Sequence, residues 1–318
     1  MITVYKHIEE ELVADYTVSD ATKGSWVNLV NPDPDELSRI NILTEILPTD
    51  VLKTALDMEE RSHVELEDNY IFVVINIPVV RGNDMYDTVP LGIFLTPDFF
   101  ITICLEESEV LYPFISNQIS TFYTYKKTRF LFQILYRTAT MFLRYLQQIN
   151  RRTDDIEVQL RHTTKNKDFF QLLELQKSMT YFTSALRTNG TVMERLLRLR
   201  GHSSYKHLLK MYEEDEDLLE DVIIENKQAI EMVEMYSNIL MNMMNAFTSI
   251  ISNNLNMVMK MLAALTITLA VPTIIFSLWG TNVPLPFQND ENGFFEVVGI
   301  SVACSIVAII GMWKKDLF

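Results

Sequence analysis

Residues 257–286 read MVMKMLAALTITLAVPTIIFSLWGTNVPLP. The apolar part, Met257–Trp279, has no charged side chain after Lys260. It is long enough to cross a bilayer, because about 20 helical residues span the hydrocarbon core. A second apolar stretch, Val297–Trp313, follows a short polar segment and lies at the lower limit of that length. The two stretches predict a membrane hairpin, with everything before it in an extramembrane domain on one side.

The basic residues predict which side that is. Lys260 opens the first stretch and a lysine pair at 314–315 follows the second, whereas the connecting loop holds only Asp290, Glu291 and Glu296 as charged residues. By the positive-inside rule both termini are expected in the cytoplasm and the loop outside, in a multi-pass protein of the cell (inner or plasma) membrane. This charge asymmetry disfavours the alternative, a buried helical hairpin in a soluble protein.

Composition narrows the possible functions. The chain of 318 residues has a net charge of −15, which disfavours nucleic acid as a partner and suits cations. The sequence contains no Gly-rich phosphate loop, no HExxH and no CxxC, so an enzyme is the weakest interpretation and no cofactor is expected.

The order of the segments predicts an α+β membrane protein. An N-terminal cytoplasmic α/β domain precedes a helical region, and a very long stalk helix then continues into the first of two C-terminal transmembrane helices. From Ser203 to Leu278 there is no glycine and only one proline, Pro272, so a single helix there would be roughly 110 Å long. The expected boundaries are 1–128 for the α/β domain, 129–202 for the helical region, 203–279 for the stalk and first span, 280–296 for the outer loop, and 297–318 for the second span and tail.

Local patterns predict the elements of the first domain. The expected strands are Trp26–Val30, Tyr70–Ile77, Leu91–Leu95 and Phe99–Leu105. The expected helices are Asp33–Leu47 and Thr49–Glu60, followed by a helical region at 109–186.

Charge is unevenly divided between the two segments that come before the membrane. Met141–Lys210 is locally basic, whereas Glu213–Glu225 is strongly acidic. Opposite blocks on consecutive helices indicate an electrostatic contact between them, which salt would screen.

The first span has a stripe of small and polar residues at steps of three and four. We call this set the polar stripe: Asn256, Met259, Ala263, Thr266, Ala270, Thr273 and Ser277. One interpretation is close helix–helix packing, for which small residues and hydroxyls are favoured in membranes. The other is a pore wall shared by several copies. The sequence favours neither over the other.

These features together resemble the CorA-type divalent cation transporters. That family carries Gly-Met-Asn at the outer end of its first span, and here the segment is Trp279-Gly280-Thr281-Asn282. The approach Asn256-Met-Val-Met-Lys260, the acidic stalk with Asp221-Val222, and Trp26-Val-Asn-Leu are also similar. The resemblance covers the whole chain and implies a homo-oligomer, most simply a pentamer, in contact with membrane lipid and divalent cations. The first spans would line its pore, and Leu262 would lie near a hydrophobic constriction.

Thr281 departs from the family motif. The resemblance implies that Gly280, Thr281 and Asn282 form the selectivity loop, with the Asn282 amide oxygen facing a hydrated cation. Mg²⁺ holds its waters tightly, so recognition through the hydration shell is chemically sensible. Other residues occur at the middle position in relatives that move other ions, so Zn²⁺, Co²⁺ or Ni²⁺ is the alternative to Mg²⁺. A non-conducting membrane-anchored sensor or scaffold is the alternative from another class.

The resemblance also implies regulation by the intracellular ion. In that family, stalk carboxylates between neighbouring subunits bind Mg²⁺ and hold the pore closed. Counting back from Asn256 without a gap, the corresponding positions here are Asp221 and Asn245. Asn245 is neutral, so the candidates for the missing charge are acidic residues within about one helical turn of Asp221, namely Glu216, Glu220 and Glu225. The alternative is that these acids repel one another across the assembly and favour opening when no cation screens them.

Overall fold

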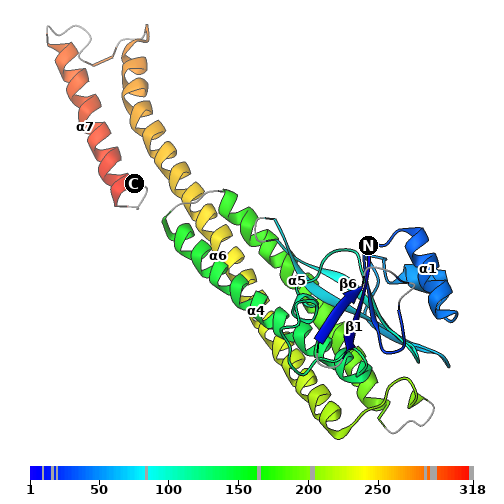
Figure 1. Cartoon of the computed structure of the whole chain (residues 1–318). Helices are drawn as coiled ribbons and strands as arrows, with labels where there is room; N and C mark the ends of the chain where they lie inside the picture. Colours follow the sequence, from blue (N-terminus) through cyan, green and yellow to red (C-terminus); the bar gives the residue numbers. More distant parts are fainter. Residues whose placement is uncertain are drawn as a thin grey trace. The chain divides into compact units, whose positions relative to one another are not determined.

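The computed structural model describes residues 1–8, 11–15, 18, 21–82, 85–162, 166–200, 205–282, 285–286 and 292–314. The chain divides into two compact units, Met1–Met243 (unit 1) and Met244–Phe318 (unit 2) (Figure 1). The long helix α6, Glu213–Trp279, contributes its first part to unit 1 and its remainder to unit 2.

Unit 1 is built on a seven-stranded sheet with the order β2-β1-β3-β7-β6-β5-β4. Strand β3 pairs in parallel with β7, and the other described pairs are antiparallel. The strands are β1 Ile2–Ile8, β2 Glu11–Asp15, β3 Trp26–Val30, β4 His63–Leu66, β5 Ile71–Arg81, β6 Met85–Leu95 and β7 Phe100–Cys104. Strand β3 has its predicted bounds, and β5, β6 and β7 overlap the predicted strands. Strands β1, β2 and β4 lie outside the predictions, because these short runs are defined by their pairing with a neighbour.

The first helices are shorter than predicted. Helix α1 is Pro34–Thr44 and α2 is Thr49–Thr54. A reciprocal capping box starts α1: the Asp33 carboxylate accepts from the Glu36 N–H at 2.7 Å, and the Glu36 carboxylate accepts from the Asp33 N–H at 3.1 Å. The helix ends where Glu45 takes a left-handed φ of 57°.

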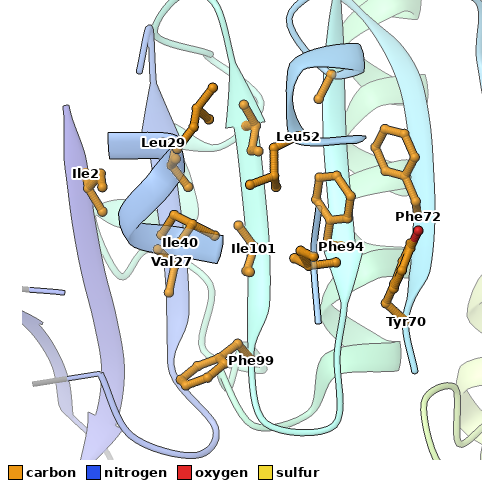
Figure 2. Packing of buried hydrophobic residues seen from close by; sticks show 14 of the residues in the cluster. Ile2, Val27, Leu29, Ile40, Leu52, Tyr70, Phe72, Phe94, Phe99 and Ile101 are labelled. Carbon is orange, nitrogen blue, oxygen red and sulfur yellow. The ribbon is translucent and has the colours of Figure 1, made fainter. Parts of the chain in front are cut away.

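One face of the sheet packs against α1 and α2. Ile40 of α1 and Leu52 of α2 are fully buried over the strands, as Figure 2 shows. In the same cluster the rings of Phe72 and Phe94 stack at 4.2 Å with an interplanar angle of 5°. Fully burying each such side chain contributes about 1.5–3 kcal/mol, so this layer is a main source of the unit's stability.

The other face carries a second aromatic layer. Side chains alternate across a strand, so Val27 and Leu29 face the α1 side while Trp26 faces the opposite side. The buried Trp26 indole donates to Thr102 Oγ1 at 2.8 Å, and its ring meets Phe130 edge-on at 4.9 Å. Trp26 therefore joins β3 both to β7 and to the helix that contains Phe130.

Long helices follow the sheet in sequence. The predicted helical region 109–186 divides into a short α3, Tyr112–Ile115, a long α4, Lys127–His162, and α5, Asn166–Arg198. Both α4 and α5 belong to unit 1 and contact β5 and β6 (Figure 1).

A buried polar joint attaches α5 to the sheet. Asn189 is fully buried, and its Oδ1 accepts from Ser62 Oγ at 2.7 Å and from the Asn76 N–H at 2.9 Å. Its Nδ2 donates to the Asn76 carbonyl at 2.8 Å. A buried amide is stable only when it has hydrogen-bond partners, and here Ser62 and the β5 residue Asn76 supply them.

The stalk helix begins later than predicted. Residues 205–212 form turns and irregular chain, and α6 starts at Glu213 instead of Ser203. The start is fixed by Asp215, whose carboxylate accepts from the Tyr212 N–H at 3.2 Å. Acidic residues fill the first turn and stabilise the positive end of the helix dipole. The predicted break at Gly201 lies outside the described residues.

Within unit 1, α5 and the first part of α6 run antiparallel. Arg200 pairs with Glu216 at 2.8 Å, and Arg187 pairs with Glu234 at 2.6 Å. The first of these pairs confirms the predicted contact between the basic and acidic blocks. Both pairs are partly exposed, so each contributes at most about 1 kcal/mol.

Unit 2 contains the remainder of α6 and α7, Gly293–Trp313. Helix α7 begins four residues before the predicted second span and ends at the predicted residue. Both helices are long and apolar enough to cross a membrane. Most of their large apolar side chains are exposed within the single chain, as expected of surfaces that contact lipid or other copies.

Candidate functional site

The predicted selectivity loop begins at the last turn of α6. The Gly280 N–H donates to the Phe276 carbonyl at 3.0 Å, and the Thr281 N–H donates to the Leu278 carbonyl at 3.2 Å. A Cβ added at Gly280 would lie 3.3 Å from the Phe276 oxygen, which is closer than an ordinary contact. Gly280 is not among the residues with positive φ, so its backbone conformation does not itself require glycine. Glycine suits this turn because it leaves room for the Phe276 carbonyl.

The side chains of the loop differ in their hydrogen bonding. Thr281 Oγ1 donates to the Leu278 carbonyl at 2.7 Å, and Trp279 Nε1 donates to the Pro286 carbonyl at 3.1 Å. Asn282 is exposed, and no hydrogen bond joins its amide to another described residue. The amide is thus available to a ligand, whereas Thr281 and Trp279 are engaged.

The polar stripe lies on one side of α6. At about 100° per residue, its members and Leu262 fall within about 60° of a common direction. Ala264, Thr268 and Ile275 point the opposite way, and Ala264 is only 1% exposed. Thr268 lines a cavity of about 530 Å³ together with Met261, Leu265 and Ile309 of α7. The side of α6 that meets α7 is therefore not the polar stripe.

The two threonine hydroxyls of the stripe are satisfied within the helix. Thr266 Oγ1 donates to the Leu262 carbonyl at 2.8 Å, and Thr273 Oγ1 donates to the Leu269 carbonyl at 2.9 Å. Asn256, Ala263 and Ser277 are exposed, and Ala270 is half-buried. The stripe is thus left free for other copies of the chain or for water.

The stalk residues do not form a metal cluster within one chain. Asp221 is exposed and Glu225 is half-buried, one turn apart on α6, while Asn245 is an exposed residue of unit 2. Among the described residues, no group of three His, Cys, Asp or Glu side chains is placed to hold a metal ion. A site that uses these residues would require ligands from another copy.

Some of the charged residues used to predict orientation lie outside the described part of the chain. These are Asp290, Glu291 and Lys315, whereas Lys260, Glu296 and Lys314 are described. Sequence reasoning missed the hydrogen bonds of Trp279 and Thr281. The Thr281 bond could have been predicted, because a hydroxyl directly after a helix end can donate to the last carbonyl groups, which lack partners within the helix.

Unit 1 also contains an open cavity that the sequence did not predict. It has a volume of about 810 Å³ and lies between the starts of α4 and α6. Lys127 lines it and donates from Nζ to the carbonyls of Thr96 and, at 2.8 Å, Pro97. Burial lowers the pKa of Lys127 to about 8, against an ordinary value of 10.5.

The fold and the candidate site define a class: a membrane protein with an extramembrane α/β domain, a long helix and two C-terminal spans joined by a polar loop. The family model described as CorA-like Mg2+ transporter protein matches residues 22–315. The chain therefore belongs to the CorA-like Mg²⁺ transporter family, whose members transport divalent cations.

Individual relatives are distant in sequence. The cobalt/magnesium transport protein CorA of Methanocaldococcus jannaschii is 24% identical over 294 residues, covering 89% of this chain and 88% of that protein. The complete structure of the CorA magnesium transporter from the same organism gives a TM-score of 0.80 at 23% identity, covering 99% of this chain and 96% of that one. The full-length CmaX protein gives 0.71 at 14% identity, covering 96% of both chains. These structural likenesses establish the fold.

Proposed function

We propose that this chain forms a homopentameric pathway that carries hydrated Mg²⁺ across the cell membrane. The observation that carries the proposal is the position of the polar stripe on the side of α6 away from α7. Five copies of that side, brought together, would surround a water-filled path whose wall offers hydroxyl and carbonyl oxygens. Asn256 and Met259 would form the inner mouth, and Leu262 an apolar ring that gates by dewetting.

The outer entrance would be the ring of Asn282 amides. Asn282 is exposed at the end of the helix that carries the stripe, and its amide has no partner among the described residues. Amide oxygens accept hydrogen bonds from the waters of a hydrated ion. Because Mg²⁺ gives up its waters reluctantly, such a ring would recognise the ion with its shell in place.

Ligand chemistry supports a hard cation. The loop and its flanks, residues 280–296, contain no His or Cys. Zn²⁺ and Ni²⁺ are usually bound through imidazole or thiolate, whereas Mg²⁺ takes oxygen ligands and water. Co²⁺ is the second candidate ion, supported by the name of the M. jannaschii relative. A hydrated Co²⁺ ion would meet the same amide ring.

Charge supports the proposed orientation. Lys260 lies near the start of the first span and Lys314 directly follows the second, whereas Glu296 lies at the loop end of α7. The proposed arrangement has both termini in the cytoplasm and the loop outside.

Regulation by the intracellular ion is part of the proposal. Asp221 and Glu225 have no ion-pair partner among the described residues, so both carboxylates are available to a cation between copies. Asn245 would contribute only a neutral amide. Binding at these positions would hold neighbouring stalks together and close the path.

The test is divalent cation flux into proteoliposomes. Wild-type protein should admit Mg²⁺, and the exchange-inert hexaamminecobalt(III) ion, which mimics a hydrated cation, should block it. Asn282→Ala should lower the flux while the protein still assembles. The control is Asn254→Ala, which is exposed on α6 but off the stripe and should leave the flux unchanged. Absence of flux for every divalent ion in the wild type would reject transport and favour a non-conducting sensor or scaffold.

A further inference from the structure

The carboxyl-terminal end of α6 is tied down by two side chains that the transport proposal does not use. The last turn leaves late carbonyl groups without intrahelical partners, as at every helix end. One of them, the Leu278 carbonyl, accepts hydrogen bonds from the Thr281 N–H at 3.2 Å and from the Thr281 hydroxyl at 2.7 Å. A side chain of the loop thus caps the helix from which the loop emerges.

Trp279 makes the second hydrogen bond that anchors the end of α6. Its indole N–H donates to the carbonyl of Pro286, seven residues further along, at 3.1 Å. This bond joins Pro286 to the last residue of α6. Gly280 lies between the two anchored side chains, where an added Cβ would come within 3.3 Å of the Phe276 oxygen. The backbone leading to Asn282 is therefore held from both sides.

We propose that Trp279 and Thr281 are positioning residues that fix the backbone of Gly280–Asn282, so that Asn282 alone presents its amide to the ion. The inference rests on the proposed function and assigns separate roles within one motif. Thr281 stabilises the helix end and Asn282 meets the cation. Methionine, which stands in the middle of the Gly-Met-Asn motif, has no hydroxyl for this bond. A chain with methionine at this position therefore cannot make this cap.

The experiment compares Thr281→Val, Thr281→Ser and Trp279→Phe in the full chain in lipid nanodiscs. Thr281→Val keeps the shape but loses the donor, Thr281→Ser keeps the donor, and Trp279→Phe removes the indole N–H. Hydrogen exchange is measured for peptides covering residues 280–286. Loss of one hydrogen bond should raise exchange about fivefold for Thr281→Val and Trp279→Phe, and Thr281→Ser should stay near wild type.

Flux gives the second readout. In Thr281→Val and Trp279→Phe the Mg²⁺ concentration for half-maximal flux and the dose of hexaamminecobalt(III) needed for block should rise several-fold, and Thr281→Ser should restore both. The control is Thr268→Val, which loses a comparable hydroxyl bond to Ala264 O at 2.8 Å on the α7 side. It should leave the exchange of the loop unchanged.

The outcomes separate the two proposals. Unchanged exchange in Thr281→Val and Trp279→Phe, or equal behaviour of the Val and Ser variants, overturns the positioning role. If the wild type carries no divalent ion, the transport proposal fails, and the exchange measurement alone still decides whether the two side chains fix the loop.

Discussion

The joint between α5 and the sheet can be tested by Asn189→Ala. Three hydrogen bonds end on the Asn189 amide: those from Ser62 Oγ and the Asn76 N–H, and the one to the Asn76 carbonyl. Each net hydrogen bond contributes about 1 kcal/mol, so the substitution should cost about 3 kcal/mol. It also leaves the Asn76 carbonyl without this donor at a part-buried position.

The loss should appear as a lower unfolding temperature. For a unit of this size, 1 kcal/mol corresponds to roughly 2–4 °C, so we expect a decrease of about 6–12 °C. The assay is thermal unfolding of the full chain in detergent, followed by intrinsic fluorescence, since Trp26 is buried in unit 1. The matched control is Thr180→Ala on the exposed side of α5, whose hydroxyl bonds only within its helix and which should shift the temperature little.

A shift below about 2 °C for Asn189→Ala would refute the reasoning, because it would mean that the sheet and α5 hold together without the joint. An equal decrease in the unfolding temperature of Thr180→Ala would also refute the reasoning, because it would mean that any substitution in α5 destabilises the protein to the same extent.

Three further predictions concern the pore, pH and the stalk. In a Cys304→Ala background, a water-soluble thiol reagent should label Thr266→Cys on the stripe at least tenfold faster than Ile267→Cys, which is exposed in the same span but points about 100° away; equal rates would reject the stripe as a water-facing wall. Because burial lowers the pKa of Lys127 to about 8, the folded chain releases this proton at a lower pH than the unfolded chain. The unfolding temperature of wild type relative to Lys127→Met should therefore rise between pH 8 and 10.5, and a constant difference would contradict this. Millimolar Mg²⁺ should protect the wild-type stalk from protease and protect Asp221→Asn less, whereas equal protection would remove Asp221 from the regulatory site.

The membrane part could be predicted well from the sequence. Its signal is local: a run of apolar residues ending at Trp279 and Trp313 fixes where each helix ends. The stripe could also be predicted, because helical periodicity alone places its members on one side of α6. Which side of α6 meets α7 could not be predicted, because it depends on how the two helices pack. In the structure Thr268 of α6 and Ile309 of α7 line the same cavity.

In unit 1 the sequence determined strands with strong apolar patterns, such as β3, and the capped start of α1 at Asp33. Only the tertiary structure decided the rest. Strand β1 exists because it lies between two partners, and Gly92 is required because a Cβ there would lie 2.4 Å from the Cβ of Ala55 in the neighbouring layer.

The same division holds at the candidate site. Sequence alone identified Gly280, Thr281 and Asn282 by their place at the end of an apolar helix. Only the three-dimensional structure separated the engaged Thr281 hydroxyl from the Asn282 amide, which has no hydrogen-bond partner in the described part of the chain. The physical reason is that residue spacing determines which positions share a helix side, whereas hydrogen-bond partners depend on how the chain folds back, as Pro286 does toward Trp279.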